Sequence, residues 1–579
     1  MDLNNMVIKI KGDLNRISRS YAFWVALGFS ALLGRGLAYG EPSNKLLTMG
    51  TSQEFDSLNQ LLTTASAAHY LMTFTNRSLV QVNPDWKWEC HLCVELPTRE
   101  NGLVKVIDEN GKKKMLVTWK IKPEAVWSDG TPITGKDFKF SWEVGTDKKV
   151  SVGEREYYDR VEEIILNDKD PKTFVMKFKE VRFDFQNLQA FYVMPAHIEE
   201  TVYRKHRSQM GAYEKNSTYV THPTRLGLSN GPYIVKEVKL GSHVTFVKNP
   251  KWYGKPASIE TITVKLISNT QTLEANLVSG TVDMINELGL SFDQAVALEK
   301  RLQRDPALGK KFRVQFEESI VYEHIELNLD NPILADIRVR KALMHAMDRQ
   351  KLVDALFQNK QKVTHTYVHP RDVFFTENVV RYEYDLGKAG ALLDEAGWKM
   401  GPQGFREKNG QKLSLNIMTT AGNKTRELVQ VFLQEQLKKV GVELSINNVP
   451  ARVLFGEVTP KRQFPALVMF AQTATPENIP ASVMHSRQIP AKENGYGGQN
   501  YAGWKNKRND EIIDLAPTEL DGGKRKGLMA EQQKIFSEDL PHFPLYMRAD
   551  VVVLPSNLKG YRMTGHLVHP SHWAEYWSF

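Results

Sequence analysis

The chain has 579 residues, more than one hydrophobic core normally holds, and this length predicts at least two domains. Its composition, with 41% hydrophobic and 25% charged residues, is usual for a soluble globular protein and excludes a disordered or fibrous chain. The net charge is +9, but no dense stripe of Lys and Arg with interleaved aromatic residues occurs, so no nucleic-acid partner is expected.

The first forty residues predict an export signal. Four basic residues precede the uncharged and mostly apolar run 21–33, and Ala38-Tyr39-Gly40 then offers small residues at the two positions that a signal peptidase reads. Thirteen residues are few for a membrane span. Arg35 lies inside the cleavage region, so an uncleaved anchor remains the alternative. We predict cleavage near Gly40 and an exported mature chain.

The two cysteines of the chain, Cys90 and Cys93, are separated by two residues. After export such a pair is a local disulfide, a redox couple or half of a zinc site. A second ligand pair at zinc-motif spacing is missing, and Val94 breaks the haem-attachment pattern. The favoured interpretation is a structural disulfide or two inert thiols, with thiol-redox chemistry as the alternative.

The segment VWSDGTPIT, 126–134, combines a Trp, a hydroxyl, a carboxylate and a glycine. The alternating run 116–122 predicts a strand before it, and Asp129-Gly130 favours a tight turn. Thr134 with Asp137 three residues later then predicts the start of a helix. The whole segment is therefore predicted as strand, turn, cap and helix, and Asp129 is not expected to be a catalytic acid.

Common catalytic motifs are missing from the sequence. It contains no phosphate-binding Gly-Lys-Ser/Thr loop, no H-E-x-x-H and no G-x-G-x-x-G. The letters G-x-S-x-G occur at 227–231, but a proline and a strand-like run follow where a nucleophile elbow needs a helix. The fifteen His are scattered. No catalytic residue, metal or cofactor is predicted.

Strands and helices alternate along the rest of the chain, which predicts an α/β protein. Residues 233–238, 244–248 and 259–267 read as strands, 270–279 as a helix and 282–285 as a short strand. A second α/β set begins near His324. It has predicted helices at 337–348, 388–396 and 425–440, strands at 413–418 and 442–449, and strand-like and aromatic sequence over 551–579.

Several segments follow one another in a specific order and spacing: Trp127–Thr134 with Asp137, Gly231-Pro232-Tyr233, Gly280 with Asp283, Arg338–Leu343, Ala346–Arg349, Asn500-Tyr501 with Trp504, and Pro544-Leu545-Tyr546. In these segments the chain resembles the peptide/nickel family of solute-binding proteins, the exported receptors of ABC importers. The resemblance implies a large two-lobe α/β fold of the type II periplasmic-binding-protein kind, with the ligand cleft between the lobes. The implied parts are signal peptide 1–40, lobe I at 41–80, 230–320 and 551–579, an inserted subdomain of lobe I at 81–229, and lobe II at 321–550.

The resemblance also implies the function. The expected protein is a periplasmic, monomeric receptor, without catalysis or cofactor, that closes on a peptide or peptide-like solute and delivers it to a membrane permease. The alternative within this fold is a receptor for another solute, such as an oligosaccharide or an opine. Alternatives of another class are a thiol-redox or hydrolytic enzyme built on Cys90/Cys93 or Ser229, and a folding helper with an aromatic cleft.

Peptide-binding members of the family typically hold the ligand's α-ammonium with an Asp of the second lobe. The corresponding segment here, 469–476, reads MFAQTATP, and nothing acidic lies between Glu457 and Glu477. Either another acid substitutes, or the peptide is held elsewhere, or the ligand is not a simple peptide. By position, the expected ligand contacts are Phe470, Gln472 and Thr473, with Asn500, Tyr501 and Trp504 nearby, Tyr157 and Tyr158 in the first lobe, and His485 and Arg487 for an anionic group.

Overall fold

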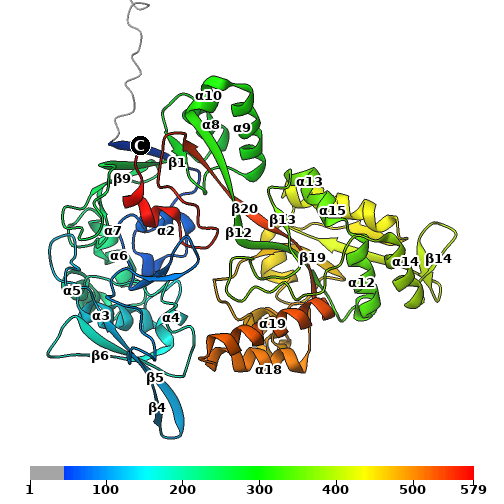
Figure 1. Ribbon diagram of the computed structural model, residues 1–579, viewed down its shortest axis with the longest axis horizontal. Helices are drawn as coiled ribbons and strands as arrows, with labels where there is room; N and C mark the ends of the chain where they lie inside the picture. The colour runs from blue at the N-terminus through cyan, green and yellow to red at the C-terminus, as the bar shows by residue number, and fades with distance from the viewer. Residues whose placement is uncertain (1–44) are drawn as a thin grey trace, which may run out of the picture. The chain divides into compact units, whose positions relative to one another are not determined.

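Two long antiparallel strands, β12 (Phe312–Leu327) and β20 (His542–Pro555), are the centre of the computed structural model, which describes residues 45–579. The predicted export signal and its cleavage site near Gly40 lie outside the described residues. Figure 1 shows the two strands side by side with further strands on either flank. Their register is interrupted between Glu318 and Tyr322, where three residues of β12 stand against one of β20.

An 11-stranded sheet extends from this central pair. We call 47–311 with 556–579 the first lobe and 328–541 the second lobe. The predicted lobe boundaries at 320/321 and 550/551 fall inside the two central strands. On the first-lobe side, the strands after β20 are β11 (Met284–Ile285), β1 (Leu46–Thr51), β10 (Thr261–Leu266), β9 (His243–Lys248) and β8 (Tyr233–Lys239). On the second-lobe side, the strands after β12 are β19 (Leu467–Gln472), β17 (Ser414–Met418) and β18 (Glu443–Ile446). The short strand β13 (Lys362–Val363) pairs with β20.

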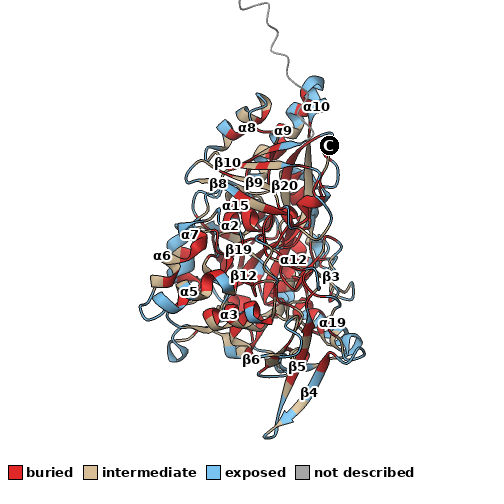
Figure 2. Cartoon of the chain, turned by 90° about the vertical axis from the view of Figure 1, so that its left-hand side faces the viewer, coloured by how far each residue is buried: buried red, intermediate tan, exposed pale blue. Residues whose placement is uncertain are grey.

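A separate four-stranded sheet belongs to the first lobe. Its order is β4 (Val104–Glu109), β5 (Lys112–Lys120), β7 (Thr173–Phe178) and β6 (Val161–Leu166), and helix α3 (Gly135–Thr146) packs against it. Figure 2 shows the β4–β5 hairpin projecting with an exposed tip, whereas the red, buried residues follow the strands behind it.

The segment between β5 and α3 forms the predicted turn and helix cap. Gly130 adopts φ +91°, which favours glycine, and its N–H donates to the Trp127 carbonyl at 2.8 Å. The Thr134 N–H donates to the Asp137 carboxylate at 2.8 Å and so begins α3. Asp129 accepts from His197 at 2.8 Å and from the Thr131 N–H at 2.9 Å. The prediction of strand, turn, cap and helix is confirmed.

Helices of the second lobe cover its part of the sheet. They include α12 (Ile337–Ala346), α14 (Leu386–Glu395) and α15 (Lys424–Lys438), close to the predicted ranges, and α18 (Lys507–Leu515) and α19 (Gly522–Asp539), which the sequence analysis did not identify. The predicted apolar face of α12 is confirmed, because Val339, Leu343 and Ala346 are all buried. Within 45–579, no helix combines the length and the apolarity that a bilayer crossing requires.

The structure joins Cys90 and Cys93 in a disulfide at the end of strand β3 (Trp88–Cys90). This strand forms a hairpin with β2 (Val80–Val82), in which Val82 stands opposite Trp88. The disulfide therefore closes a short loop beside a hairpin, and this location suits a structural bridge.

Candidate binding cleft between the lobes

A cavity of about 270 Å³ lies at the inner face of the first lobe and reaches the second lobe at Thr475. We call it the first cavity. Most of the lining residues carry hydroxyl, amide or imidazole groups, although apolar atoms supply more of the cavity surface. The side chains come from four segments: Gln60 to Gln81, Glu154 with Tyr157, Gln189 to Val193, and Leu567 to His572.

The loop 73–78 contributes Thr73, Asn76, Arg77 and Ser78 to this lining, and a family-like segment holds the loop from behind. The Asn230 side chain accepts from the Arg77 N–H at 2.7 Å and donates to the Arg77 carbonyl at 3.1 Å. The Gly231 N–H donates to the Thr75 carbonyl at 2.7 Å. A Cβ at Gly231 would lie 2.8 Å from the Thr75 carbonyl, so only glycine allows this approach.

Segment 227–231, which matched a hydrolase motif by letters, is thus a structural support. The Ser128 hydroxyl accepts from the Gly227 N–H at 2.8 Å, and the Ser128 N–H donates to the Ser229 carbonyl at 2.8 Å. Ser229 is buried, and the strand β8 follows it at Tyr233 instead of a helix. Hydrogen bonds from segment 126–134 therefore fix the position of segment 227–231, and segment 227–231 in turn fixes the loop 73–78 of the cavity wall.

Arg77 lies in the wall of the first cavity with 1% of its surface exposed. Its guanidinium donates to the Glu575 carboxylate at 2.9 Å, to the Thr73 carbonyl at 2.7 Å and to the Asn76 carbonyl at 3.0 Å. Because Glu575 neutralises this charge inside the protein, Arg77 shapes the wall and is not a free cation for a ligand.

His572 lines the cavity with 2% of its surface exposed, and neither ring nitrogen has a hydrogen-bond partner among the described residues. Burial, with the nearby Arg77 charge, lowers the pKa of His572 well below its usual value. The ring is therefore neutral at physiological pH and offers one donor and one acceptor. Both nitrogens are buried, so His572 is part of the cavity wall and does not present an exposed donor or acceptor.

Glu154 is the one acidic residue in the described lining of the first cavity. Its carboxylate makes no ion pair or hydrogen bond with the rest of 45–579. Glu154 is exposed at the edge of the cavity. Partial desolvation, and then the charge of Glu156, raises its pKa above the ordinary 4.5. The cavity thus contains one carboxylate that is available to a cation.

A second cavity, also of about 270 Å³, lies on the other side of the hairpin β2–β3. Both lobes line it, with Trp88 and Phe183 from the first lobe and Pro476, Glu477 and Arg525 from the second. The two cavities together form a cleft that is bounded by both lobes.

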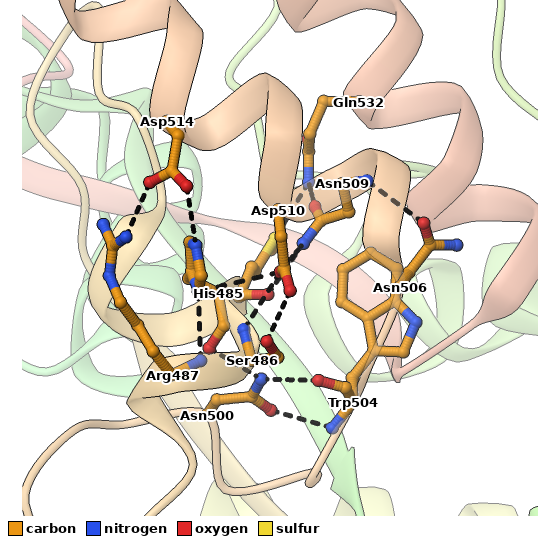
Figure 3. A network of polar contacts seen from close by, with 11 residues as sticks. His485, Ser486, Arg487, Asn500, Trp504, Asn506, Asn509, Asp510, Asp514 and Gln532 are labelled. Atoms are coloured by element: carbon orange, nitrogen blue, oxygen red, sulfur yellow. Dashed lines mark hydrogen bonds and ion pairs between the residues drawn. The ribbon is translucent and has the colours of Figure 1, made fainter.

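Four of the expected ligand contacts lie inside the second lobe, away from both cavities (Figure 3). His485 and Arg487 pair with Asp514 at 3.4 and 2.7 Å. The Asn500 side chain accepts from the Trp504 N–H at 3.0 Å and donates to its carbonyl at 2.9 Å. These polar groups are already satisfied, and they join α18 to the loops before it.

The other expected contacts are distributed differently. Tyr157 lines the first cavity, whereas Tyr158 is fully buried and accepts from the Tyr192 N–H. Phe470 is buried against His324, and Gln472 accepts from the Tyr322 hydroxyl at 3.1 Å. Thr473 is exposed, and Tyr501 is half-buried near Phe470. Of the ten residues, Tyr157 alone lines either of the two described cavities, and ligand contact by all ten stays a prediction.

The sequence analysis missed most of the cavity lining, including Arg77, Glu154 and His572. Some signals were present: Glu154 lies three residues before Tyr157, and His572 belongs to the cluster HPSHW in an aromatic-rich tail. Arg77 gave no signal, because a charged residue before an apolar strand normally marks a surface loop.

One group of side chains within 45–579 could hold a metal ion: His324, Glu326 and His542, on β12 and β20. Both imidazoles approach the same Glu326 oxygen, at 3.2 and 3.5 Å. Burial alone would raise the pKa of Glu326, but the hydrogen bonds from the two His outweigh it and lower this pKa to about 2. The group lies buried on the two central strands, and the His324 Nδ1 atom has no hydrogen-bond partner among the described residues.

Comparisons with known proteins agree with this architecture. The family model for bacterial extracellular solute-binding proteins, family 5 Middle, matches residues 105–489. The oligopeptide-binding protein AppA of Bacillus subtilis is 27% identical over 453 residues, which cover 76% of this chain and 77% of the relative.

Solved structures extend the comparison. The oligopeptide-binding protein of Thermus thermophilus, complexed with a pentapeptide, aligns with a TM-score of 0.66 and 29% identity over 93% of this chain and 97% of that one. The substrate-binding protein CtaP of Listeria monocytogenes aligns with a TM-score of 0.73 at 18% identity over 92% of this chain and 98% of that one, which shows the fold alone. The chain therefore belongs to family 5 of the bacterial extracellular solute-binding proteins.

Proposed function

We propose that this protein is an exported, monomeric receptor that binds peptides between its lobes and delivers them to the membrane permease of an ABC importer. Its relatives include several oligopeptide-binding proteins, and one was solved with a pentapeptide. These names favour a peptide over the oligosaccharide or opine alternative. Export is supported by the basic and apolar sequence before Gly40.

The observation that carries this proposal is the polar lining of the first cavity. Its hydroxyls and amides match the alternating donors and acceptors of a peptide backbone, and the ion pair with Glu575 neutralises the Arg77 cation. A ligand that contacts both lobes stabilises the closed arrangement and shifts the population toward it. The ligand is expected to leave unchanged, because the matching family is one of solute-binding proteins.

Peptides are therefore expected to raise the thermal unfolding midpoint of the purified protein. A ligand that binds only the folded state adds about 2.7 kcal/mol of stability at a hundredfold excess over its dissociation constant. A thermal-shift panel of peptides, oligosaccharides and opines measures this, and mass spectrometry of the recovered peptide checks for turnover. Stabilisation by sugars alone, or conversion of the peptide to a product, contradicts the proposal.

We further propose that Glu154 receives the ligand's α-ammonium, because the second-lobe segment 469–476 contains no acidic residue. Glu154→Gln is then expected to weaken binding of free-amine peptides about 10- to 100-fold, because a charge-assisted hydrogen bond contributes about 1.5–3 kcal/mol. Isothermal titration with free and N-acetylated peptides measures the effect. Wild-type affinity should also fall as the pH is lowered toward the raised pKa of Glu154, since only the carboxylate pairs with the ammonium.

The neighbouring variant Glu156→Gln is the matched control. Glu156 pairs with Arg160 at 2.9 Å and does not line the cavity, so its loss should change affinity less than about threefold. If Glu154→Gln binds free-amine and acetylated peptides as the wild type does, the ammonium is held elsewhere. Peptide binding itself remains the test of the receptor function.

A further inference from the structure

The two cavities of the cleft are separated by a contact between the lobes. Thr475 lines the first cavity, whereas the next two residues, Pro476 and Glu477, line the second. On the first lobe, Gln81 of β2 lines the first cavity and Trp88 of β3 the second. The hairpin β2–β3 and the segment 475–477 therefore meet between the cavities.

A hydrogen bond closes this meeting point. The Trp88 indole N–H donates to the Glu477 carboxylate at 2.8 Å, across 389 positions of sequence. The preceding turn of the hairpin reinforces the contact, because the Trp86 ring stacks on His369 of the second lobe at a centroid distance of 4.4 Å. Both aromatic residues of the hairpin thus face the second lobe.

The second lobe holds its side of the contact firmly. Glu477 adopts φ +58°, a left-handed conformation that side-chain-bearing residues rarely take and that costs about 1–2 kcal/mol. Its N–H donates to the Asp372 carboxylate at 2.8 Å, and the same carboxylate accepts from the Phe374 N–H at 2.8 Å. These bonds fix the backbone so that the Glu477 side chain points at Trp88.

We infer that the Trp88–Glu477 contact is a partition that limits the length of the bound peptide. The first cavity lies on one side of this contact, and nearly all of its lining belongs to the first lobe. An extended tripeptide spans at most about 10 Å, and a peptide of that length occupies the first cavity with the partition closed. A longer peptide has to cross between the cavities, where the Trp88 ring lies. The inference rests on the proposed peptide-binding function.

The partition also explains why the cleft divides into two cavities. Opening it requires the loss of one partly buried hydrogen bond and the displacement of an indole ring, and both oppose a long ligand. The protein is therefore a receptor for short peptides. Trp88 and Glu477 limit the length of the bound peptide without contacting its ends.

Two variants open the partition by different routes. Trp88→Ala removes the ring, and Glu477→Gly removes the carboxylate at a backbone position where glycine is favoured. Glu477→Gln is the matched control, because its amide oxygen still accepts from Trp88. Circular dichroism verifies that each variant folds, and isothermal titration with a series from dipeptides to nonapeptides gives the dissociation constants.

We expect the wild type to bind tripeptides at least about tenfold more tightly than pentapeptides and longer chains. Both opening variants should improve affinity for the longer peptides about tenfold and change tripeptide affinity less than about threefold, whereas Glu477→Gln should retain the wild-type profile. Peptide binding with no dependence on length, or with the same dependence in the opening variants, overturns the inference alone. Failure of every peptide to bind overturns the receptor function as well.

Discussion

Replacing Arg77 by Met is expected to lower the free energy of unfolding by about 3–5 kcal/mol. The substitution leaves the Glu575 carboxylate buried without its partner, and this is the costly way to break a buried ion pair. It also removes the donors to the Thr73 and Asn76 carbonyls. Urea denaturation followed by tryptophan fluorescence measures the change. The slope of the unfolding free energy against urea concentration should stay the same.

The same substitution at Arg562 is the control for Arg77. Arg562 pairs with Asp85 at 2.6 Å, but both side chains are more than half exposed, so Arg562→Met should cost less than about 1 kcal/mol. The double variant Arg77→Met/Glu575→Gln should recover part of the lost stability, because it removes the unpaired charge. Equal losses in Arg77→Met and Arg562→Met would show that the buried pair contributes nothing beyond a surface pair.

Peptide binding should weaken in Arg77→Met even at temperatures at which the variant is folded. Arg77 holds the carbonyls of the loop that supplies Thr73, Asn76 and Ser78 to the first cavity. A loop without these donors samples more conformations, and the ligand must then order it on binding. Affinity measured well below the unfolding midpoint separates this effect from the loss of stability.

Gly231→Ala is expected to destabilise the protein by about 1–3 kcal/mol. The new methyl group would lie 2.8 Å from both the carbonyl carbon and the oxygen of Thr75, and a backbone cannot yield as a flexible side chain does. The displacement also stretches the hydrogen bond from the Gly231 N–H to the Thr75 carbonyl, now 2.7 Å. Thermal and urea unfolding give the magnitude.

A second glycine gives a control of opposite sign. Gly527 lies inside α19, and a Cβ added there would have no neighbouring atom within 4 Å, so the methyl group of Ala meets open space. Gly527→Ala should stabilise the protein by about 0.4–1 kcal/mol, because alanine restricts the unfolded chain and favours a helix. Destabilisation of similar size at both positions would contradict the steric explanation at Gly231.

The sequence alone determined the local structure that supports the cleft. Turn chemistry at Asp129-Gly130, the cap at Thr134 with Asp137, and the spacing of apolar residues along α12 each depend on residues a few positions apart. Such short-range preferences are readable in a single chain. The order of the family-like segments likewise predicted the two-lobe fold and the solute-binding class.

Only the tertiary structure decided which side chains line the two cavities. Arg77 meets Glu575 across nearly five hundred residues, and Trp88 meets Glu477 across almost four hundred. The polar residues that looked available, His485 and Asn500, are instead paired inside the second lobe. Sequence gives the donors and acceptors of each residue but not their partners, and a polar group binds a ligand only where the fold leaves it unpaired.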